Sequence, residues 1–470
     1  MDQMKRDARI RSVKLLNVFL MTLVFATIWL NCYGSNLYIK GFYRRGNWLL
    51  IALFGFLYYS FGRTYDAFQV SYHRISEMVY SQGLAIFMTD AVMMVVTWLL
   101  MRHFPSLLPI LVIFLFQLII SAIWSTLAHR WYFHAFHAKK TMIIYDMREG
   151  MEELISQYGM ESKFDVRQVL QINDLLHQGV QKLEGYESVY LCGIHSKQRN
   201  IILKYCVEKG ITVFVIPRIG DVLMSSAKRM HMFHLPVLRI DRYKPVPEYI
   251  FAKRLFDIVL SLIALIILSP VIGIVALAVK SDGGPALYKQ VRLTKDGKEF
   301  KVLKFRSMRV DAEKDGVARL STGDKDDRIT KVGRIIRACR LDELPQLWNI
   351  FVGDMSIVGP RPERPEIAKE YLKELPEFNL RLQAKAGLTG YAQVYGKYNT
   401  SPYDKLMMDL MYIAHPSIVE DIRIILATIK ILFLPESTEG VAAGHTTAMD
   451  YENEANHTEK LEKREEHCAD

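Results

Sequence analysis

The sequence predicts a membrane protein with four N-terminal transmembrane helices, a small α/β Rossmann-like module, and an α-rich cytoplasmic domain that carries a re-entrant membrane helix. Three observations lead to this prediction. Half of the residues are hydrophobic and the mean hydropathy is positive, which is unusual for a soluble protein. Four apolar stretches near the ~20 residues that a bilayer requires precede residue 130. A fifth apolar run, at 258–279, is interrupted by Ser269 and Pro270.

The four N-terminal stretches define a transmembrane region at residues 1–130. They lie at 14–32, 48–61, 84–101 and 107–127, and the second is short. Asp90 in the third stretch is expected to face other helices rather than lipid. The basic and then apolar N-terminus lacks a small-residue cleavage site, which favours a retained anchor over a signal peptide.

Basic residues favour an orientation with both ends of this region in the cytoplasm. Five cations precede the first stretch and three follow the fourth, whereas a smaller group in the first loop argues against this orientation. These residues are Lys5, Arg6, Arg9, Arg11 and Lys14, then Arg130, Lys139 and Lys140, and in the loop Lys40, Arg44 and Arg45.

Charge and cysteine content narrow the class of partner. The net charge of +10 is compatible with nucleic acid, anionic lipid or phosphorylated substrates, and the apolar segments favour the last two. The five cysteines are scattered, with no CxxC or Cys/His spacing, so neither a disulfide framework nor a zinc site is predicted.

Residues 131–248 are expected to form an α/β module with a mostly parallel sheet. Short apolar runs at 142–145, 189–192, 213–216 and 237–240 alternate with polar, helix-compatible stretches. A dinucleotide site would require a glycine-rich turn after the first strand, and the sequence has no glycine there before Gly150. We therefore expect a regulatory or assembly module rather than a dinucleotide-binding one.

The apolar run at 258–279 has two interpretations. A spanning helix would move the following residues to the outer face. A helix broken at Ser269 and Pro270 can return to the same face, because proline removes a helical hydrogen bond and a serine hydroxyl can replace part of the lost bonding. We favour the re-entrant helix. It belongs to a domain at 249–435, and a disordered acidic tail is expected at 436–470.

Four short blocks in this domain carry the chemistry: KFRSM at 304–308, LDELPQ at 341–346, GDMS at 353–356 running into GPRP at 359–362, and GLTG at 387–390. Asp342 and Glu343 repel each other, so a Mg²⁺ ion or nearby cations must keep both ionised. The cations available are Lys304, Arg306, Arg334, Arg337, Arg340 and Arg361. Such a set suits phosphoryl chemistry, in which guanidinium groups and a metal stabilise negative charge and a carboxylate can act as nucleophile.

The order and wording of these blocks closely resemble the bacterial sugar transferase family, the monotopic polyprenyl-phosphate sugar-1-phosphate transferases. The resemblance runs from about residue 253 to 433 and includes Lys253, Arg254 and Asp257 as well as the Ser-Pro break. The N-terminal layout resembles the large branch of the family, which has four membrane helices and a nucleotide-fold-like module ahead of the catalytic domain.

This resemblance implies a role for each matching residue. Asp342 matches the nucleophile, which attacks the sugar-linked phosphate of a UDP-sugar, releases UMP and holds a covalent phosphosugar. Glu343 matches its partner beside Mg²⁺, so both carboxylates are candidate metal ligands. Arg337 matches a phosphate-binding arginine. Candidate phosphate or nucleotide contacts are Lys304, Arg306 and Arg361.

Three positions depart from the family pattern. Cys339-Arg340 stands where Thr-Ser is common, Thr294 where glycine is usual, and Ala386 where proline often precedes Gly387. These departures affect the expected loop geometry and sugar preference but not the reaction class. Asp354 is expected to form a turn or helix cap rather than a catalytic contact.

The resemblance thus implies an undecaprenyl-phosphate sugar phosphotransferase in the bacterial inner membrane that initiates exopolysaccharide or capsule synthesis. Its expected partners are a UDP-sugar, undecaprenyl phosphate, the lipid bilayer and Mg²⁺, with no nucleic acid and with a homodimer plausible. Two alternatives remain: a membrane scaffold with a vestigial catalytic domain, and a polytopic transferase that forms no covalent intermediate. The sequence does not identify the sugar.

Overall fold

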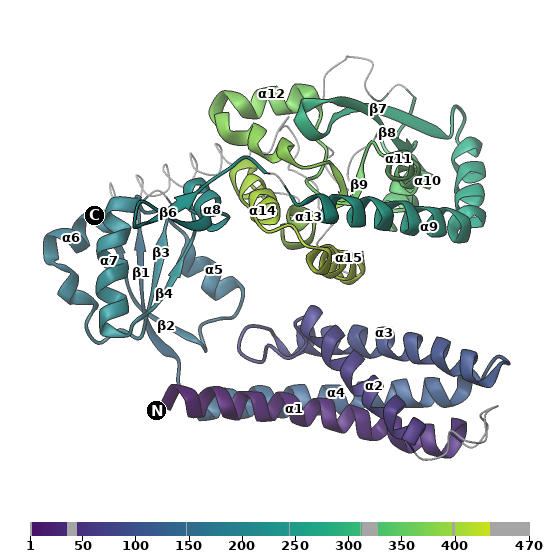
Figure 1. Cartoon of the computed structure of the whole chain (residues 1–470), viewed down its shortest axis with the longest axis horizontal. Coiled ribbons are helices and arrows are strands. Elements are labelled where there is room, and N and C mark those ends of the chain that lie inside the picture. The colour runs from purple at the N-terminus through teal and green to yellow at the C-terminus, as the bar shows by residue number, and fades with distance from the viewer. Residues whose placement is uncertain are drawn as a thin grey trace, which may run out of the picture. The chain divides into compact units, whose positions relative to one another are not determined.

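The computed structural model describes residues 2–34, 45–146, 148–243, 245–310, 312, 328–396 and 400–432. Contacts divide the chain into two compact units, Met1–Pro217 and Arg218–Asp470 (Figure 1). The second unit begins earlier in the chain than the domain predicted from residue 249, because helix α8 (Ile219–Ser225) and the hairpin of β5 (Lys228–Met232) and β6 (Leu235–Arg239) belong with the second unit. The predicted acidic tail at 436–470 and the loop cations Lys40 and Arg44 lie outside the described residues.

The first unit opens with an antiparallel set of long helices. They are α1 (Asp2–Ile28), continued by a π-helical turn (Trp29–Tyr33), α2 (Arg45–Thr64), α3 (Ile75–Met101) and α4 (Leu107–Ala135). All four predicted N-terminal stretches are therefore helical. Three of them, at Arg6–Tyr33, Ile75–Met101 and Leu107–Ala135, are long and apolar enough to cross a membrane, whereas α2 is shorter, with 20 residues.

Polar side chains inside this helix bundle bond to one another. Gln82 accepts hydrogen bonds from Asn17 over 3.3 Å and from Ser121 over 2.7 Å, and Tyr58 donates to Asn17 over 2.8 Å. All four side chains are buried. Asp90 is also buried and faces the bundle, in agreement with the prediction that it avoids lipid.

A four-stranded parallel sheet follows the bundle in the same unit. Its strand order is β2-β1-β3-β4, and the strands are β1 (Lys139–Tyr145), β2 (Phe164–Gln171), β3 (Ser188–Cys192) and β4 (Thr212–Val215). Helices α6 (Ile172–Gln178) and α7 (Ser196–Lys209) pack on one face and α5 (Met151–Gln157) on the other. The parallel sheet agrees with the predicted α/β module, and its likeness to a nucleotide-binding fold stays a prediction.

The second unit combines short strands with helices (Figure 1). Its elements are α8 (Ile219–Ser225), β5 (Lys228–Met232), β6 (Leu235–Arg239), α9 (Pro247–Ser281), β7 (Leu287–Leu293), β8 (Glu299–Phe305), α10 (Lys331–Ala338), α11 (Gln346–Val352), β9 (Ser356–Val358), α12 (Pro365–Glu374), β10 (Gly387–Thr389), α13 (Tyr391–Tyr395), α14 (Pro402–Ala414) and α15 (Ile418–Leu432). The apolar run at 237–240 falls on β6, in an antiparallel hairpin with β5 rather than in the parallel sheet.

Helix α9 contains the interrupted apolar run and is also long and apolar enough to cross a membrane. Ser269 donates its hydroxyl to the carbonyl of Ile266 over 2.8 Å, one residue before Pro270. Figure 1 draws α9 as two helical segments that meet at an angle. One side of the helix packs on the core of the unit at Leu268 and Val275, whereas the opposite side, which includes Ile267, is exposed.

Candidate functional site

Asp342 and Glu343 lie in a short 3-10 turn, Leu341–Glu343 (η6), between α10 and α11. The preceding Arg340 has a left-handed backbone with a φ of 52°. This conformation costs a residue other than glycine about 1–3 kcal/mol and persists only where the surroundings fix it. On the C-terminal side of the two carboxylates, α11 begins at Gln346 and buries Ile350 in the core. The two carboxylates are therefore held by a constrained residue on one side and a packed helix on the other.

Two cations from separate parts of the unit bind Glu343. Lys304, near the end of β8, lies 2.8 Å from the Oε1 atom of Glu343, and Arg361, which follows β9, lies 3.2 Å from the same oxygen. The Glu343 side chain is only 14% exposed, so these charges are less screened than a surface pair. Three residues predicted from three different motifs thus meet at one carboxylate.

The pKa values of the two carboxylates move in opposite directions. Burial and the neighbouring Glu343 charge raise the pKa of Asp342 above its usual value. Burial alone would also raise the pKa of Glu343, but the charges of Lys304 and Arg361 hold that pKa well below its usual range. Carboxylate pairs whose environments separate their pKa values take different chemical roles. Glu343 is therefore the firmly ionised member, and Asp342 is the more basic one.

Arg337 lies in the last turn of α10, where its charge partly offsets the raised pKa of Asp342. Thr330 caps the start of this helix, and its side chain accepts a hydrogen bond from the Gly333 amide. A Cβ atom on Gly333 would lie 1.9 Å from the carbonyl oxygen of Ser307, so only glycine fits there. This contact fixes α10, and with it Arg337, against the KFRSM block.

Arg306 does not join this cluster of charges. Its guanidinium is buried and donates to the carbonyls of Val279, over 2.9 Å, and Pro285, over 3.0 Å. These carbonyls lie in and just beyond the last turn of α9, where a helix leaves its carbonyls without helical partners. Arg306 thus caps the C-terminal end of α9, and the role of phosphate ligand predicted for Arg306 stays a prediction.

The GPRP and GLTG blocks meet through their backbones. The Gly359 amide donates to the carbonyl of Thr389 over 2.8 Å, and the Gly387 amide donates to Pro360 over 2.9 Å. A Cβ on Gly387 would lie 2.1 Å from the Gly359 nitrogen, so two backbone segments this close together require glycine at this position. The fourth block therefore supports the segment that carries Arg361.

Two of the departures from the family pattern lie in contact. The Thr294 hydroxyl accepts a hydrogen bond from the Ala386 amide over 3.2 Å and donates to the carbonyl of Asp354 over 3.2 Å. A proline at 386 would have no N–H to donate. Asp354 itself lies in the turn after α11 and accepts a hydrogen bond from Asn349 over 3.1 Å, in agreement with the predicted turn role.

The start of α9 is bonded to the same core. Arg254 donates to the carbonyls of Ile350 and Phe351, both over 2.8 Å, at the end of α11. One turn later, Asp257 accepts a hydrogen bond from the Ile357 amide of β9 over 3.0 Å. Both ends of α9 are therefore attached to elements that carry the candidate site.

Sequence reasoning missed several buried charges. Asp421 on α15 accepts hydrogen bonds from Lys253, Tyr249 and Tyr412, and Arg381 pairs with Asp409 on α14. None of the four blocks contains these residues. The only signal in the sequence was an ionisable residue at an otherwise apolar helical position, as at Asp409 and Asp421.

The described residues contain no group of three or more histidine, cysteine, aspartate or glutamate side chains able to enclose a metal. Mg²⁺ does not require such a group, because it is commonly held by one or two carboxylates together with substrate phosphate and water. Asp342, which is half-buried, makes no hydrogen bond or ion pair with another described side chain, so its oxygens remain available. The donor set fits Mg²⁺ held jointly with a phosphorylated substrate.

Known proteins match this part of the chain. The sequence profile of the family described as bacterial sugar transferase matches residues 248–435. The chain is 34% identical over 232 residues to the UDP-N-acetylgalactosamine-undecaprenyl-phosphate N-acetylgalactosaminephosphotransferase of Aeromonas hydrophila, covering 48% of this chain and 54% of that protein.

Two relatives share the printed name UDP-glucose:undecaprenyl-phosphate glucose-1-phosphate transferase. The protein from Escherichia coli is 43% identical over 183 residues, which cover 38% of this chain and 39% of that protein. The protein from Caulobacter vibrioides is 39% identical over 191 residues, which cover 39% of this chain and 71% of that protein. The chain therefore spans about half or less of the longer relatives and most of the shorter one. The chain belongs to the bacterial sugar transferase family.

Proposed function

We propose that this protein transfers a sugar 1-phosphate from a UDP-sugar to undecaprenyl phosphate and so initiates exopolysaccharide or capsule synthesis. The observation that carries the proposal is the pair Asp342 and Glu343, with Lys304 and Arg361 on the glutamate and Arg337 beside the aspartate. Such a site offers one basic carboxylate to a reacting phosphorus and several cations to its oxygens. The printed names of the relatives support this class of donor and acceptor.

The reaction has two displacements at one phosphorus atom. An oxygen of Asp342 attacks the sugar-linked phosphorus of the UDP-sugar, the bond from that phosphorus to the bridging oxygen breaks, and UMP leaves with that oxygen. A phosphate oxygen of undecaprenyl phosphate then attacks the same phosphorus and frees Asp342. The product is undecaprenyl diphosphate sugar. Because the pKa of Asp342 is raised, Asp342 is the better nucleophile of the two carboxylates once it is ionised.

Mg²⁺ is part of the proposal. Asp342 and Glu343 would hold it together with the substrate phosphates, and when bound it supplies neutralisation of the negative charge on those phosphates. Lys304 and Arg361 orient Glu343, and Arg337 and Arg340 add positive charge around the carboxylates.

We further propose that α9 is re-entrant and that the second unit lies on the cytoplasmic side of the inner membrane. A helix of 35 residues is roughly 50 Å long when straight, enough to place its ends on opposite faces of a bilayer. Instead, Arg254 near its start and Val279 near its end both bond to the core of one compact unit. Labelling of cysteines introduced at exposed Ile250 and Lys298 tests this, and labels on opposite faces of vesicles would contradict it.

The test of the reaction is UMP release by purified full-length protein offered UDP-glucose, UDP-galactose and UDP-N-acetylgalactosamine. We expect Asp342→Asn to lower the rate by at least roughly 10³-fold, because amide nitrogen and oxygen are poor nucleophiles. Arg242→Gln, which removes only an exposed ion pair with Asp296, is the matched control. Mass spectrometry of wild-type protein should show a phosphosugar adduct on Asp342. Equal rates for Asp342→Asn and wild type would refute the nucleophile, and release without an adduct would favour direct transfer.

The α/β module and the oligomeric state remain outside this mechanism. We propose a regulatory or assembly role for the module, since the sequence after β1 lacks a glycine-rich phosphate-binding turn. A homodimer is compatible with this role. Light scattering of the detergent-solubilised chain, with and without residues 139–217, would test the assembly role, and an unchanged mass would contradict it.

A further inference from the structure

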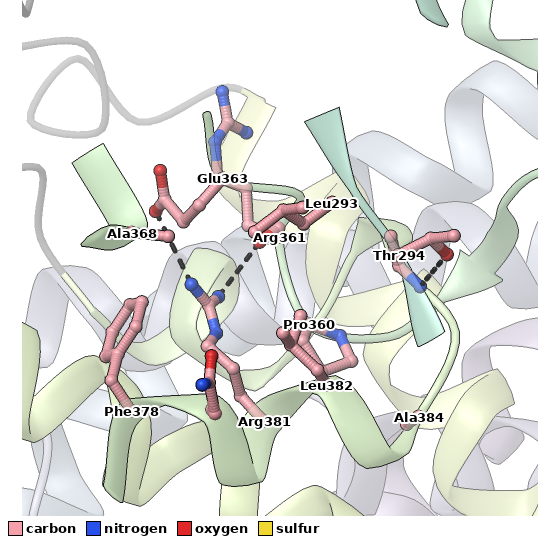
Figure 2. Close-up of a pocket in the computed structure, with 12 residues that line it drawn as sticks. Leu293, Thr294, Pro360, Arg361, Glu363, Ala368, Phe378, Arg381, Leu382 and Ala384 are labelled. Atoms are coloured by element: carbon pink, nitrogen blue, oxygen red, sulfur yellow. Dashed lines mark hydrogen bonds and ion pairs between the residues drawn. The ribbon is translucent and has the colours of Figure 1, made fainter. Parts of the chain in front are cut away.

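A second arginine, Arg381, contacts the backbone of Arg361 and lies outside the four sequence blocks. Arg381 sits in a 3-10 segment, Pro376–Gln383, and its side chain is only 3% exposed. One of its guanidinium nitrogens, Nη2, donates to the backbone carbonyl of Arg361 over 2.9 Å. Figure 2 shows the Arg381 guanidinium pointing toward Glu363 and the backbone at Arg361. Arg381 therefore holds the main chain from which the Arg361 side chain starts.

The charge of Arg381 is compensated inside the protein. Asp409 on α14, 1% exposed, accepts a hydrogen bond from the Arg381 Nε over 2.8 Å, and the same carboxylate oxygen lies 2.7 Å from Nη2 in an ion pair. Glu363 lies 3.6 Å from Nη1. A buried ion pair is a poor source of stability, because an apolar pair of similar volume is often as stable or more so. The geometry of this pair indicates a purpose other than stability, namely to fix the direction of one guanidinium.

The same segment is held at neighbouring positions. Arg292 donates to the carbonyl of Pro362 over 3.1 Å, and the Leu293 amide donates to the carbonyl of Glu363 over 3.0 Å. These bonds fix the segment after Arg361, whereas Arg381 acts at Arg361 itself. The side chain of Arg361 is 43% exposed and long, so its start point and direction decide whether it reaches Glu343.

We propose that Arg381 is a positioning residue for the transfer reaction: held by Asp409, it fixes the backbone of Arg361 so that the Arg361 guanidinium stays on Glu343. The proposal rests on the proposed function, because Arg361 and Glu343 matter for the rate only if this site carries the chemistry. A displacement of about 1 Å in such a group can lower a rate by roughly 10²-fold.

The experiment compares four full-length variants with wild type: Arg381→Lys, Arg361→Gln, the double variant, and Arg242→Gln as the control. A lysine can still pair with Asp409 but has no second, fixed nitrogen for the Arg361 carbonyl. UMP release is measured with whichever of UDP-glucose, UDP-galactose and UDP-N-acetylgalactosamine wild-type protein uses fastest. We expect Arg381→Lys to lower kcat roughly 10- to 100-fold with a much smaller change in KM. The double variant should be no slower than Arg361→Gln alone, since both changes remove one interaction.

Two outcomes overturn the proposal. One is a rate for Arg381→Lys equal to that of Arg242→Gln, and the other is a double variant whose losses multiply, which would mean that Arg381 acts independently of Arg361. Should Arg381→Lys fail to fold, Asp409→Asn keeps Arg381 and its bond to the Arg361 carbonyl, and the asparagine side-chain oxygen can still accept from the Arg381 Nε and hold its direction. Positioning then predicts that most of the rate is retained, and a loss as large as that of Arg361→Gln overturns it.

Hydrogen exchange separates this proposal from the proposed function. In Arg381→Lys we expect faster amide exchange at residues 359–363 than in wild type, and no such change in Arg242→Gln. Wild-type protein that releases no UMP would refute the proposed function. Unchanged exchange at 359–363 would refute the positioning role whether or not the protein turns over.

Discussion

The membrane bundle and the second unit bury polar groups in different ways. Inside the bundle, Gln82, Asn17, Tyr58 and Ser121 form a hydrogen-bonded set without net charge. In the second unit several buried groups form ion pairs, such as Lys253 with Asp421 and Arg381 with Asp409. Neutral bonds hold helices together without moving charge into an apolar medium, whereas ion pairs fix direction. The difference indicates that the bundle is built for packing and the second unit for orienting charged groups.

The largest effect that would test this comparison is at Asp421. Replacement by alanine removes the ion-pair partner of Lys253, which is only 16% exposed, and the acceptor of Tyr249 and Tyr412. We expect a loss of about 3–5 kcal/mol in the unfolding free energy of the second unit. Asp421→Asn keeps an oxygen acceptor and should cost less. Denaturation of the full chain in detergent, followed by circular dichroism, measures both, and equal losses would mean that the charge does not matter.

A smaller effect is expected in the bundle, where substitutions of two equally buried glutamines can be compared. Gln82→Leu removes the acceptor of Asn17 and Ser121 and should cost about 1–3 kcal/mol. Gln117 is equally buried, but its amide makes no hydrogen bond among the described residues. Gln117→Leu should therefore be neutral or stabilising. The measurement is the thermal midpoint in detergent, and the reverse order would show that the bonded set contributes nothing.

The last effect depends on pH and concerns Lys163, a buried charge that lies in the first unit but outside the helix bundle. Lys163, at the edge of the sheet, donates to Ser71 over 3.1 Å, and burial, with the charges of Lys139 and Arg6, lowers the pKa of Lys163 to about 7. Its ordinary pKa is 10.5. Between these values the unfolded chain binds more protons than the folded one, so stability rises with pH from 7 toward 10. Lys163→Met should remove that rise.

Thermal midpoints between pH 6 and pH 9 measure this slope. Lys197→Met replaces an exposed lysine of the same module and should leave the slope as it is in wild type. A wild-type midpoint that falls as pH rises through this range would contradict the assignment to Lys163.

Much of the fold followed from the sequence because its signals are local. The four N-terminal helices, the apolar helix that contains Ser269 and Pro270, and three strands of the parallel sheet are each visible in a short window of sequence. Strand β2 was missed, because its sequence FDVRQVLQ alternates apolar and polar residues at the edge of the sheet and lacks the apolar run of a buried strand. The apolar run at 237–240 was assigned to the parallel sheet, but it belongs to the β5–β6 hairpin. An apolar run can predict a strand, but it does not show which other strand it pairs with.

The candidate site was less accessible to sequence reasoning. Lys304, Arg361 and Glu343 meet as their motifs suggested, yet Arg306, in the same block as Lys304, turns to the end of α9 instead. A sequence motif shows which residues occur together but not where their side chains point. The support from Arg381 and Asp409 depends on contacts between α14 and a distant 3-10 segment, and no spacing along the chain encodes such a contact.

The hydrogen bond between Thr294 and Ala386 couples the residues that these two positions can accept. Proline at 386 would leave the Thr294 hydroxyl without that donor, and glycine at 294 would leave the Ala386 amide buried without its acceptor. Each residue common in the family is thus a poor single replacement here, whereas the two together would be compatible. The residue that position 294 tolerates therefore depends on the residue at position 386, and the reverse.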